Sequence, residues 1–290
     1  MRTVPRVSIE VFPPRGEAAE VQLQETLAKL TPLAPDYVSV TYGAGGSAAR
    51  DLSTRTLAMV LQHEGLNPAG HLTCVGAPCS HVDGMARDWW ELGVRRIVAL
   101  RGDMPDMGSA YRPHPEGYGT TADLVCGLKA VGDFDISVGA YPEGHPESPD
   151  LDADLDNLKS KLDAGAARAI TQYFFEPETF LRFRDRARAR GITAPLVPGI
   201  MPIFHFGKIV AFSQRCGASI PSWLAERFEG LDDDPETRGQ VSASLSVRLC
   251  ERLIAEGVDA FHFYTLNRPT LTLAVCRAIG IQPAGLKEAA

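Results

Sequence analysis

The chain has 290 residues, of which 44% are hydrophobic and 22% are charged. This apolar content is enough for a large core, and it excludes a disordered or coiled-coil protein. The formal net charge of −7 argues against nucleic acid as the main partner, because phosphate contacts need a basic surface. We also expect no membrane segment, since the sequence has no run of about 18 apolar residues.

The six cysteines form no CxxC pair and show no Cys/His spacing typical of a metal site, so we expect reduced thiols and no bound metal. The N-terminus is too short and polar for a signal peptide. The sequence therefore predicts a soluble cytoplasmic protein. Arginines occupy every second position from Arg182 to Arg190, a spacing that spreads around a helix and indicates a solvated helix face.

Short apolar runs with period-2 alternation recur through the whole chain. They predict eight strands, at Val7–Phe12, Tyr37–Thr41, His71–Cys74, Arg96–Gly102, Ile136–Tyr141, Ala169–Phe174, Pro195–Ile200 and Phe261–Leu266. Segments with helical period lie between them, for example Val21–Leu33, Leu52–Glu64, Val82–Leu92, Asp152–Ala164, Pro177–Arg190 and Pro235–Glu256. The last segment has Asp234 as a candidate N-cap, Pro235 at the first helical position and Gly257 after its end.

Eight strand–helix alternations predict an α/β protein, a single parallel (β/α)₈ TIM barrel over residues 1–290. Three intervals depart from the simple alternation. Met104–Thr121 and Gly144–Leu151 are loops after the fourth and fifth strands, and residues 202–258 contain extra helices before the eighth strand. All three follow strands, so they lie on the face where barrel enzymes place their active sites.

The segment Gly43–Ala48 fits the glycine pattern of dinucleotide-binding folds and follows a predicted strand. Such a fold also needs an acidic residue at the end of the next strand, but that strand contains the residues His71–Cys74. The segment also belongs to the second unit of an eight-unit series. A Rossmann domain is therefore disfavoured.

Alternation within the strands predicts which side chains face the barrel axis. Val7, Ile9 and Val11 face the helices, which leaves Ser8, Glu10 and Phe12 inside. On the other strands the inward set is Ser39, Thr41, His71, Thr73, Arg101, Asp103, Tyr141, Gln172, His262 and Tyr264.

Barrel interiors are normally filled by Val, Ile and Leu, so this polar set at the carboxyl ends of the strands predicts a functional site. An enclosed Glu10 is suited to act there as a general acid. The alternative is that Glu10 and Arg101 form a buried structural ion pair. Asp154, Asn157 and Lys161 share one face of the fifth helix, although the spacing alone favours a solvated face.

Ten segments, taken in order, resemble one known family. They are Val7–Arg15, Val38–Gly43, His71–Cys74, Ile97–Asp103, Ala140–Glu147, Lys161–Gly165, Ala169–Gln172, Pro198–Pro202, Gly230–Asp234 and His262–Arg268. They are similar to the methylenetetrahydrofolate reductases, flavoenzymes of one-carbon metabolism. The resemblance implies an FAD-binding barrel that reduces 5,10-methylenetetrahydrofolate to 5-methyltetrahydrofolate. NADH or NADPH would reduce the flavin first, and folate would then enter the same space, in a ping-pong order.

The resemblance also implies roles for individual residues. Glu10 matches the family's catalytic acid, and Asp103 matches a carboxylate close to the flavin and the pterin ring. The positions that match cofactor contacts are Thr41, Tyr42, Ala44, His71, Arg101, Gly102, Asp103, Thr121, Tyr141, His145, Ser148, Asp154, Asn157, Ser160 and Lys161. Gln172, Phe212 and Arg268 match folate contacts, and Lys208 stands where bacterial relatives often have a folate-binding glutamine.

The resemblance to bacterial members further implies a homo-oligomer without a regulatory domain after the barrel. Two alternatives stay open. One is a barrel of the same family that receives electrons from another redox protein, and the other is a folate-binding protein without a flavin. An aldolase-type barrel is disfavoured, because no glycine-rich phosphate site follows the seventh and eighth strands.

Overall fold

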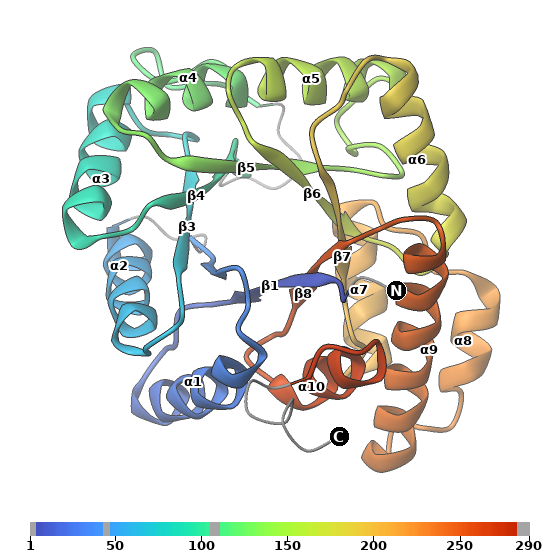
Figure 1. Cartoon of the computed structure of the whole chain (residues 1–290). Helices are drawn as coiled ribbons and strands as arrows, with labels where there is room; N and C mark the ends of the chain where they lie inside the picture. The colour runs from blue at the N-terminus through green and yellow to red at the C-terminus, as the bar shows by residue number, and fades with distance from the viewer. Residues whose placement is uncertain (1–3, 43–46, 105–110, 283–290) are drawn as a thin grey trace.

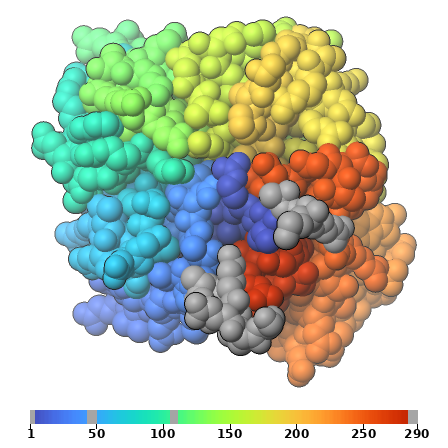
Figure 2. Space-filling model, viewed as in Figure 1, coloured from blue at the N-terminus to red at the C-terminus, as the bar shows by residue number. Residues whose placement is uncertain are grey.

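A computed structural model describes residues 4–42, 47–104 and 111–282 of the chain. Its eight strands are all parallel and close into a barrel in sequence order, which confirms the predicted fold (Figure 1). The strands are β1 Arg6–Val11, β2 Val38–Val40, β3 Pro68–Thr73, β4 Arg96–Leu100, β5 Asp135–Ala140, β6 Arg168–Tyr173, β7 Leu196–Ile200 and β8 Ala260–Tyr264. The blue start and the red end of the chain lie side by side in Figure 2, as the pairing of β1 with β8 requires.

Helices surround the barrel in the order that the sequence predicts (Figure 1). They are α1 Glu17–Leu30, the 3₁₀ turn η1 Thr31–Leu33, α2 Ser47–Gln62, α3 Cys79–Leu92, α4 Thr121–Val131, α5 Leu151–Asp163, α6 Pro177–Ala189, α7 Phe206–Cys216, α8 Ser222–Phe228, α9 Pro235–Ala255 and α10 Pro269–Ala278. The extra helices predicted before the eighth strand are α7 and α8. The predicted cap of α9 is confirmed, because the Asp234 side chain accepts a hydrogen bond from Thr237 N at 3.0 Å. None of the helices among the described residues has the length and apolarity needed to span a bilayer.

Two apolar layers hold the barrel together. Outside the strands, Val7, Ile9 and Val11 are buried against the helices, as alternation predicts. Inside, a smaller apolar cluster contains Tyr37 and Val98, which fill the barrel axis. Burial of this kind stabilises by about 25 cal/mol for each Å² of apolar surface removed from water. The barrel is therefore a packed scaffold, and only its carboxyl end is free to form a site.

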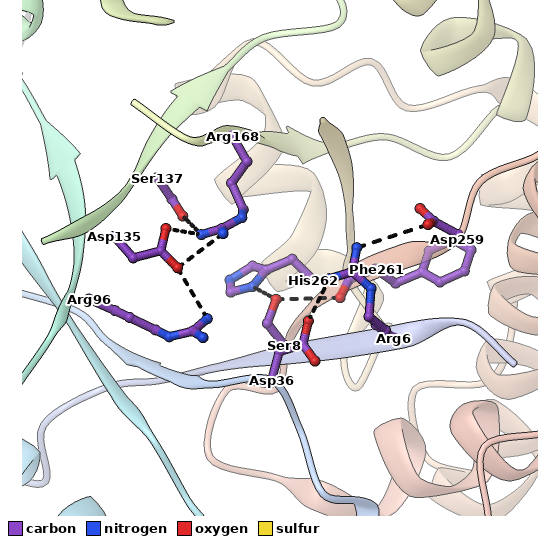
Figure 3. A network of polar contacts seen from close by, with 10 residues as sticks. All are labelled: Arg6, Ser8, Asp36, Arg96, Asp135, Ser137, Arg168, Asp259, Phe261 and His262. Carbon is purple, nitrogen blue, oxygen red and sulfur yellow. Dashed lines mark hydrogen bonds and ion pairs between the residues drawn. The ribbon is translucent and has the colours of Figure 1, made fainter. Parts of the chain in front are cut away.

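A polar cluster closes the amino-terminal end of the barrel, where β4, β5 and β6 begin (Figure 3). Asp135 Oδ1 and Oδ2 accept hydrogen bonds from Arg168 at 2.8 and 3.0 Å, and Asp135 Oδ2 also lies 3.5 Å from Arg96 Nη1. Arg168 also donates to Ser137 Oγ at 3.2 Å. The Asp135 carboxylate lies between two guanidinium groups, so it offsets positive charge that Arg96 and Arg168 bring to the starts of β4 and β6.

One predicted orientation is wrong. Phe12 was expected to face the barrel interior, but its side chain is 42% exposed. The reason is that β1 ends at Val11, so alternation no longer applies to the following residue. Phe12 lies instead at the rim, where its backbone bonds to Asn267.

Candidate active site

Two adjoining cavities of about 280 and 320 Å³ lie at the carboxyl ends of β2 to β5. They have Leu100, Arg101, Tyr141 and His145 in common, so the two cavities adjoin each other, and we call them together the groove. Most of the predicted cofactor residues line this groove: Thr41, Tyr42, His71, Arg101, Gly102, Asp103, Thr121, Tyr141, His145, Ser148, Asn157 and Lys161. The structure therefore brings together residues from six separate stretches of sequence.

Two of the described residues that were predicted to bind the cofactor, Asp154 and Ser160, do not line the groove. Ala44 lies outside the described residues. Asp154 is buried behind the groove, where its carboxylate accepts a hydrogen bond from Ser148 Oγ at 3.2 Å. Ser160 is exposed, and its hydroxyl donates to the backbone carbonyl of Asp156 at 3.0 Å. The roles of these residues stay predictions.

Glu10 points into the barrel beneath the groove, between two histidines. Its Oε2 lies 3.5 Å from His71 Nε2 and 4.0 Å from His262 Nε2. The other ring nitrogen of His262 is hydrogen-bonded to Ser8 Oγ at 2.7 Å, which fixes the orientation of the imidazole. The carboxyl is thus enclosed by side chains that can exchange hydrogen bonds with it, as a general acid requires.

The alternative in which Glu10 pairs with Arg101 is wrong. Both ends of the Arg101 guanidinium instead bind Glu147, with N–O distances of 2.6 and 3.0 Å. These hydrogen bonds lower the pKa of Glu147. Glu147 was not among the predicted site residues. An arginine at the end of a barrel strand needs a counter-charge, and this requirement could have indicated a carboxylate partner for Arg101.

His71 is neutral at physiological pH. Burial lowers its pKa to about 4, although the nearby Glu10 carboxylate raises it. The Nε2 atom is buried and has no hydrogen-bond partner among the described residues. A buried polar atom without a partner costs free energy, so this nitrogen is suited to bond a ligand in the groove.

Lys161 places a cation under the same groove. Its side chain is buried, and Nζ donates to the carbonyl of Gly139 at 2.7 Å. Burial lowers the pKa of the ammonium to about 8, while Asp154 raises it. On the helix face that Lys161 shares with Asp154 and Asn157, Asp154 and Lys161 are buried, and Asn157 is exposed but lines the groove. The face is therefore not a fully solvated one.

The predicted substrate residues lie on the opposite side of the barrel mouth, on β6, α7 and the turn after β8. Gln172 Oε1 accepts a hydrogen bond from Tyr173 N at 3.1 Å. Phe212 stacks on Tyr173 with ring centroids 6.0 Å apart, and Lys208 is exposed one turn earlier on α7. Arg268 is exposed, and its guanidinium lies 5.5 Å from the ring of Phe204.

The family model described as methylenetetrahydrofolate reductase matches residues 2–280. The chain belongs to the methylenetetrahydrofolate reductase family. This membership confirms the resemblance seen in the sequence. A 5,10-methylenetetrahydrofolate reductase of Pectobacterium carotovorum and one of Escherichia coli K12 are each 48% identical over 277 residues, covering 96% of this chain and 91% of the relative. A methylenetetrahydrofolate reductase 2 of Saccharomyces cerevisiae is 33% identical and matches over 48% of its own length.

Solved structures share the fold of this reductase-family chain at much lower identity. A protein of Clostridium thermocellum, described as binding two copies of 5-methyl-5,6,7,8-tetrahydrofolic acid, superimposes with a TM-score of 0.63 at 15% identity, covering 96% of this chain and 95% of its own. An oxaloacetate acetylhydrolase superimposes with a TM-score of 0.53 at 12% identity, covering 95% and 80%. At these identities the likeness shows the barrel fold alone.

Proposed function

We propose that this chain reduces 5,10-methylenetetrahydrofolate to 5-methyltetrahydrofolate, with FAD as bound cofactor and NADH or NADPH as electron donor. The observation that carries the proposal is the position of Glu10. It is an enclosed carboxyl next to a polar groove, in a chain of the methylenetetrahydrofolate reductase family. The groove would hold the large cofactor, and Glu10 would supply a proton to the folate substrate.

The residues of the groove fit FAD in shape and chemistry. The two adjoining cavities have volumes of about 280 and 320 Å³, and the first is lined by the buried Lys161 ammonium, which is suited to a diphosphate. The unpartnered Nε2 of His71 and the ring of Tyr141 are suited to a polar aromatic system. Bound FAD would supply the hydride transfer, chemistry that these side chains do not provide.

Glu10 would hold and deliver the proton of the reaction. Opening of the methylene bridge requires protonation of a folate nitrogen, which breaks one carbon–nitrogen bond and leaves an iminium that accepts hydride. His71 is neutral, so the two side chains do not form a full ion pair, although Glu10 Oε2 lies 3.5 Å from His71 Nε2. Asp103, exposed at the groove after β4, would orient the folate.

We propose that nicotinamide and folate use the mouth above Glu10 in turn. Absorption spectra of the purified protein, recorded anaerobically before and after addition of NADH and then NADPH, test the proposal. We expect oxidised-flavin absorption bands that NADH or NADPH bleaches. 5,10-Methylenetetrahydrofolate should affect these bands only after that bleaching has occurred. A flavin that neither nicotinamide bleaches would favour another redox protein as donor. A colourless protein that FAD does not reconstitute would overturn the proposal.

The pKa of Lys161 predicts how FAD affinity depends on pH. The folded-state pKa of about 8 lies below the ordinary value of 10.5. Between these values the unfolded chain binds a proton that the folded apoprotein lacks, so this group makes the apoprotein more stable as pH rises. A bound diphosphate favours the charged lysine, and FAD affinity should therefore fall by up to about tenfold per pH unit above pH 8.

Titration of the apoprotein with FAD at a series of pH values measures this dependence through quenching of flavin fluorescence. Lys161→Met is the matched control, because it keeps a long apolar chain and removes the titrating charge. The variant should bind FAD more weakly at pH 7 and with much less dependence on pH. If the variant shows the same pH slope as the native chain, Lys161 does not contact the diphosphate.

A further inference from the structure

The turn after β8 has an unusual backbone conformation. Leu266 and Asn267 have φ angles of 51° and 54°, in the left-handed region that side chains with a Cβ rarely adopt. Ala34 is the one other non-glycine residue with positive φ in the described part of the chain. Two consecutive residues of this kind persist only where the surroundings impose them, and such positions gather at functional sites.

The side chain of Asn267 continues the pairing of β1 with β8 after the strand backbones have separated. Main-chain pairing extends to Glu10 opposite Tyr264. Beyond that point, Asn267 Nδ2 donates to the carbonyl of Phe12 at 2.8 Å, and Asn267 Oδ1 accepts from Phe12 N at 3.0 Å. One side-chain amide thus satisfies both backbone groups of Phe12, the residue that directly follows β1 and lies two positions after Glu10.

Two further contacts fix the same turn. The carbonyl of Asn267 accepts hydrogen bonds from Thr26 Oγ1 at 3.1 Å and Gln22 Nε2 at 3.3 Å, both on α1. Thr265 Oγ1 donates to the carbonyl of Glu10 at 2.6 Å. Asn267 itself is only 4% exposed, so its side chain and carbonyl are held within the protein.

The residue that follows this fixed turn is Arg268. It precedes α10 as its N-cap residue and is exposed at the barrel mouth. Glu10 and Arg268 are far apart in the sequence, and the bonds of Thr265 to Glu10 and of Asn267 to Phe12 connect the turn after β8 to the segment that carries Glu10.

We propose that Asn267 is a positioning residue that fixes Arg268 relative to Glu10, so that the guanidinium and the acid act on the same substrate molecule. The inference rests on the proposed function, in which Glu10 protonates the folate and Arg268 contacts it. Proper orientation of a substrate against a catalytic group contributes much of the rate, and a shift of about 1 Å costs on the order of 100-fold. Asn267 itself does not touch the reacting atoms.

Two substitutions separate the side-chain pairing from the backbone conformation. Asn267→Gly keeps the left-handed backbone without strain and removes both bonds to Phe12. Asn267→Asp keeps the shape and the acceptor for Phe12 N but places an oxygen against the carbonyl of Phe12. In rapid-mixing experiments on the holoenzyme, we expect both variants to lower the kcat/KM for folate by about 10- to 100-fold. Flavin reduction by nicotinamide should change by less than about twofold, because the β2 to β5 groove is untouched.

Two comparisons show whether the loss of positioning causes the lower kcat/KM for folate. Val275→Ala, a fully buried truncation on α10, should lower the melting temperature without changing the folate half-reaction. In an Arg268→Gln background, Asn267→Gly should lower kcat/KM for folate by less than about threefold, because the group that it positions is gone.

Each outcome has a distinct meaning. Equal losses in both half-reactions, or a full loss that persists in the Arg268→Gln background, would overturn the positioning role. A folate half-reaction that is unchanged in both Asn267 variants would overturn it as well. A native holoenzyme that does not reduce folate at all would instead overturn the proposed function.

Discussion

Glu10→Gln should leave reduction of the flavin by nicotinamide within about twofold of the native rate and lower folate reduction by about 10²- to 10⁴-fold. Glutamine preserves the shape of the side chain next to His71 and His262, but it has no acidic proton to deliver. Hydride transfer from nicotinamide needs no proton from this group. Anaerobic rapid mixing with each substrate separately measures the two half-reactions.

Glu25→Gln is the matched control for this prediction, since Glu25 is an exposed residue of α1 away from the mouth. It should leave both half-reactions unchanged. The proposed role of Glu10 requires the two half-reactions to separate. If Glu10→Gln slows both equally, the carboxylate supports the structure of the barrel interior and is not the proton donor.

Gly102→Ala should abolish retention of FAD. Gly102 follows β4 at the centre of the groove and has a φ of +85°, which costs about 1–2 kcal/mol for a residue with a Cβ. A Cβ there would also lie 2.5 Å from Val75 Cγ1 and 3.0 Å from Thr73 Cβ, two residues that line the same groove. The loop must shift, and Arg101 shifts with it. The ratio of flavin to protein absorbance after purification measures the loss.

Gly65→Ala isolates the backbone contribution to this effect. Gly65 has the same φ of +85°, but a Cβ there meets no atom within 4 Å, and the residue follows α2 away from the groove. We expect it to lower the free energy of unfolding by about 1–2 kcal/mol and to retain FAD fully. Retention of FAD by Gly102→Ala as well would show that the groove does not hold the cofactor.

The fold was predictable because its signals are local. Alternating apolar residues marked all eight strands, and Asp234 with Pro235 marked the start of α9. Helix starts were less accurate, since α2 begins at Ser47 and not Leu52. The first turn of this helix is mostly polar, so hydrophobic periodicity does not include it. The prediction that Phe12 faces the barrel interior was wrong for a related reason, because alternation gives no sign of where a strand ends.

The positions of site residues were predictable at the ends of strands and less predictable in loops. His71 and Arg101 were placed correctly at the groove by strand position alone. The partner of Arg101 could not be found in this way, because Glu147 lies on a loop whose path depends on tertiary packing. Spacing on α5 likewise did not show that Lys161 is buried, since a helix face is solvated or covered depending on its neighbours.

The cluster of Arg96, Asp135 and Arg168 has a consequence for how a ligand reaches the barrel interior. Together with the apolar cluster around Val98, it occupies the amino-terminal part of the barrel interior, and the cavities beside Glu10 lie at the carboxyl end. A ligand in these cavities therefore approaches Glu10 from the carboxyl ends of the strands. If donor and acceptor both bind there, as we propose, they occupy the same space in turn, and their alternation needs no moving gate.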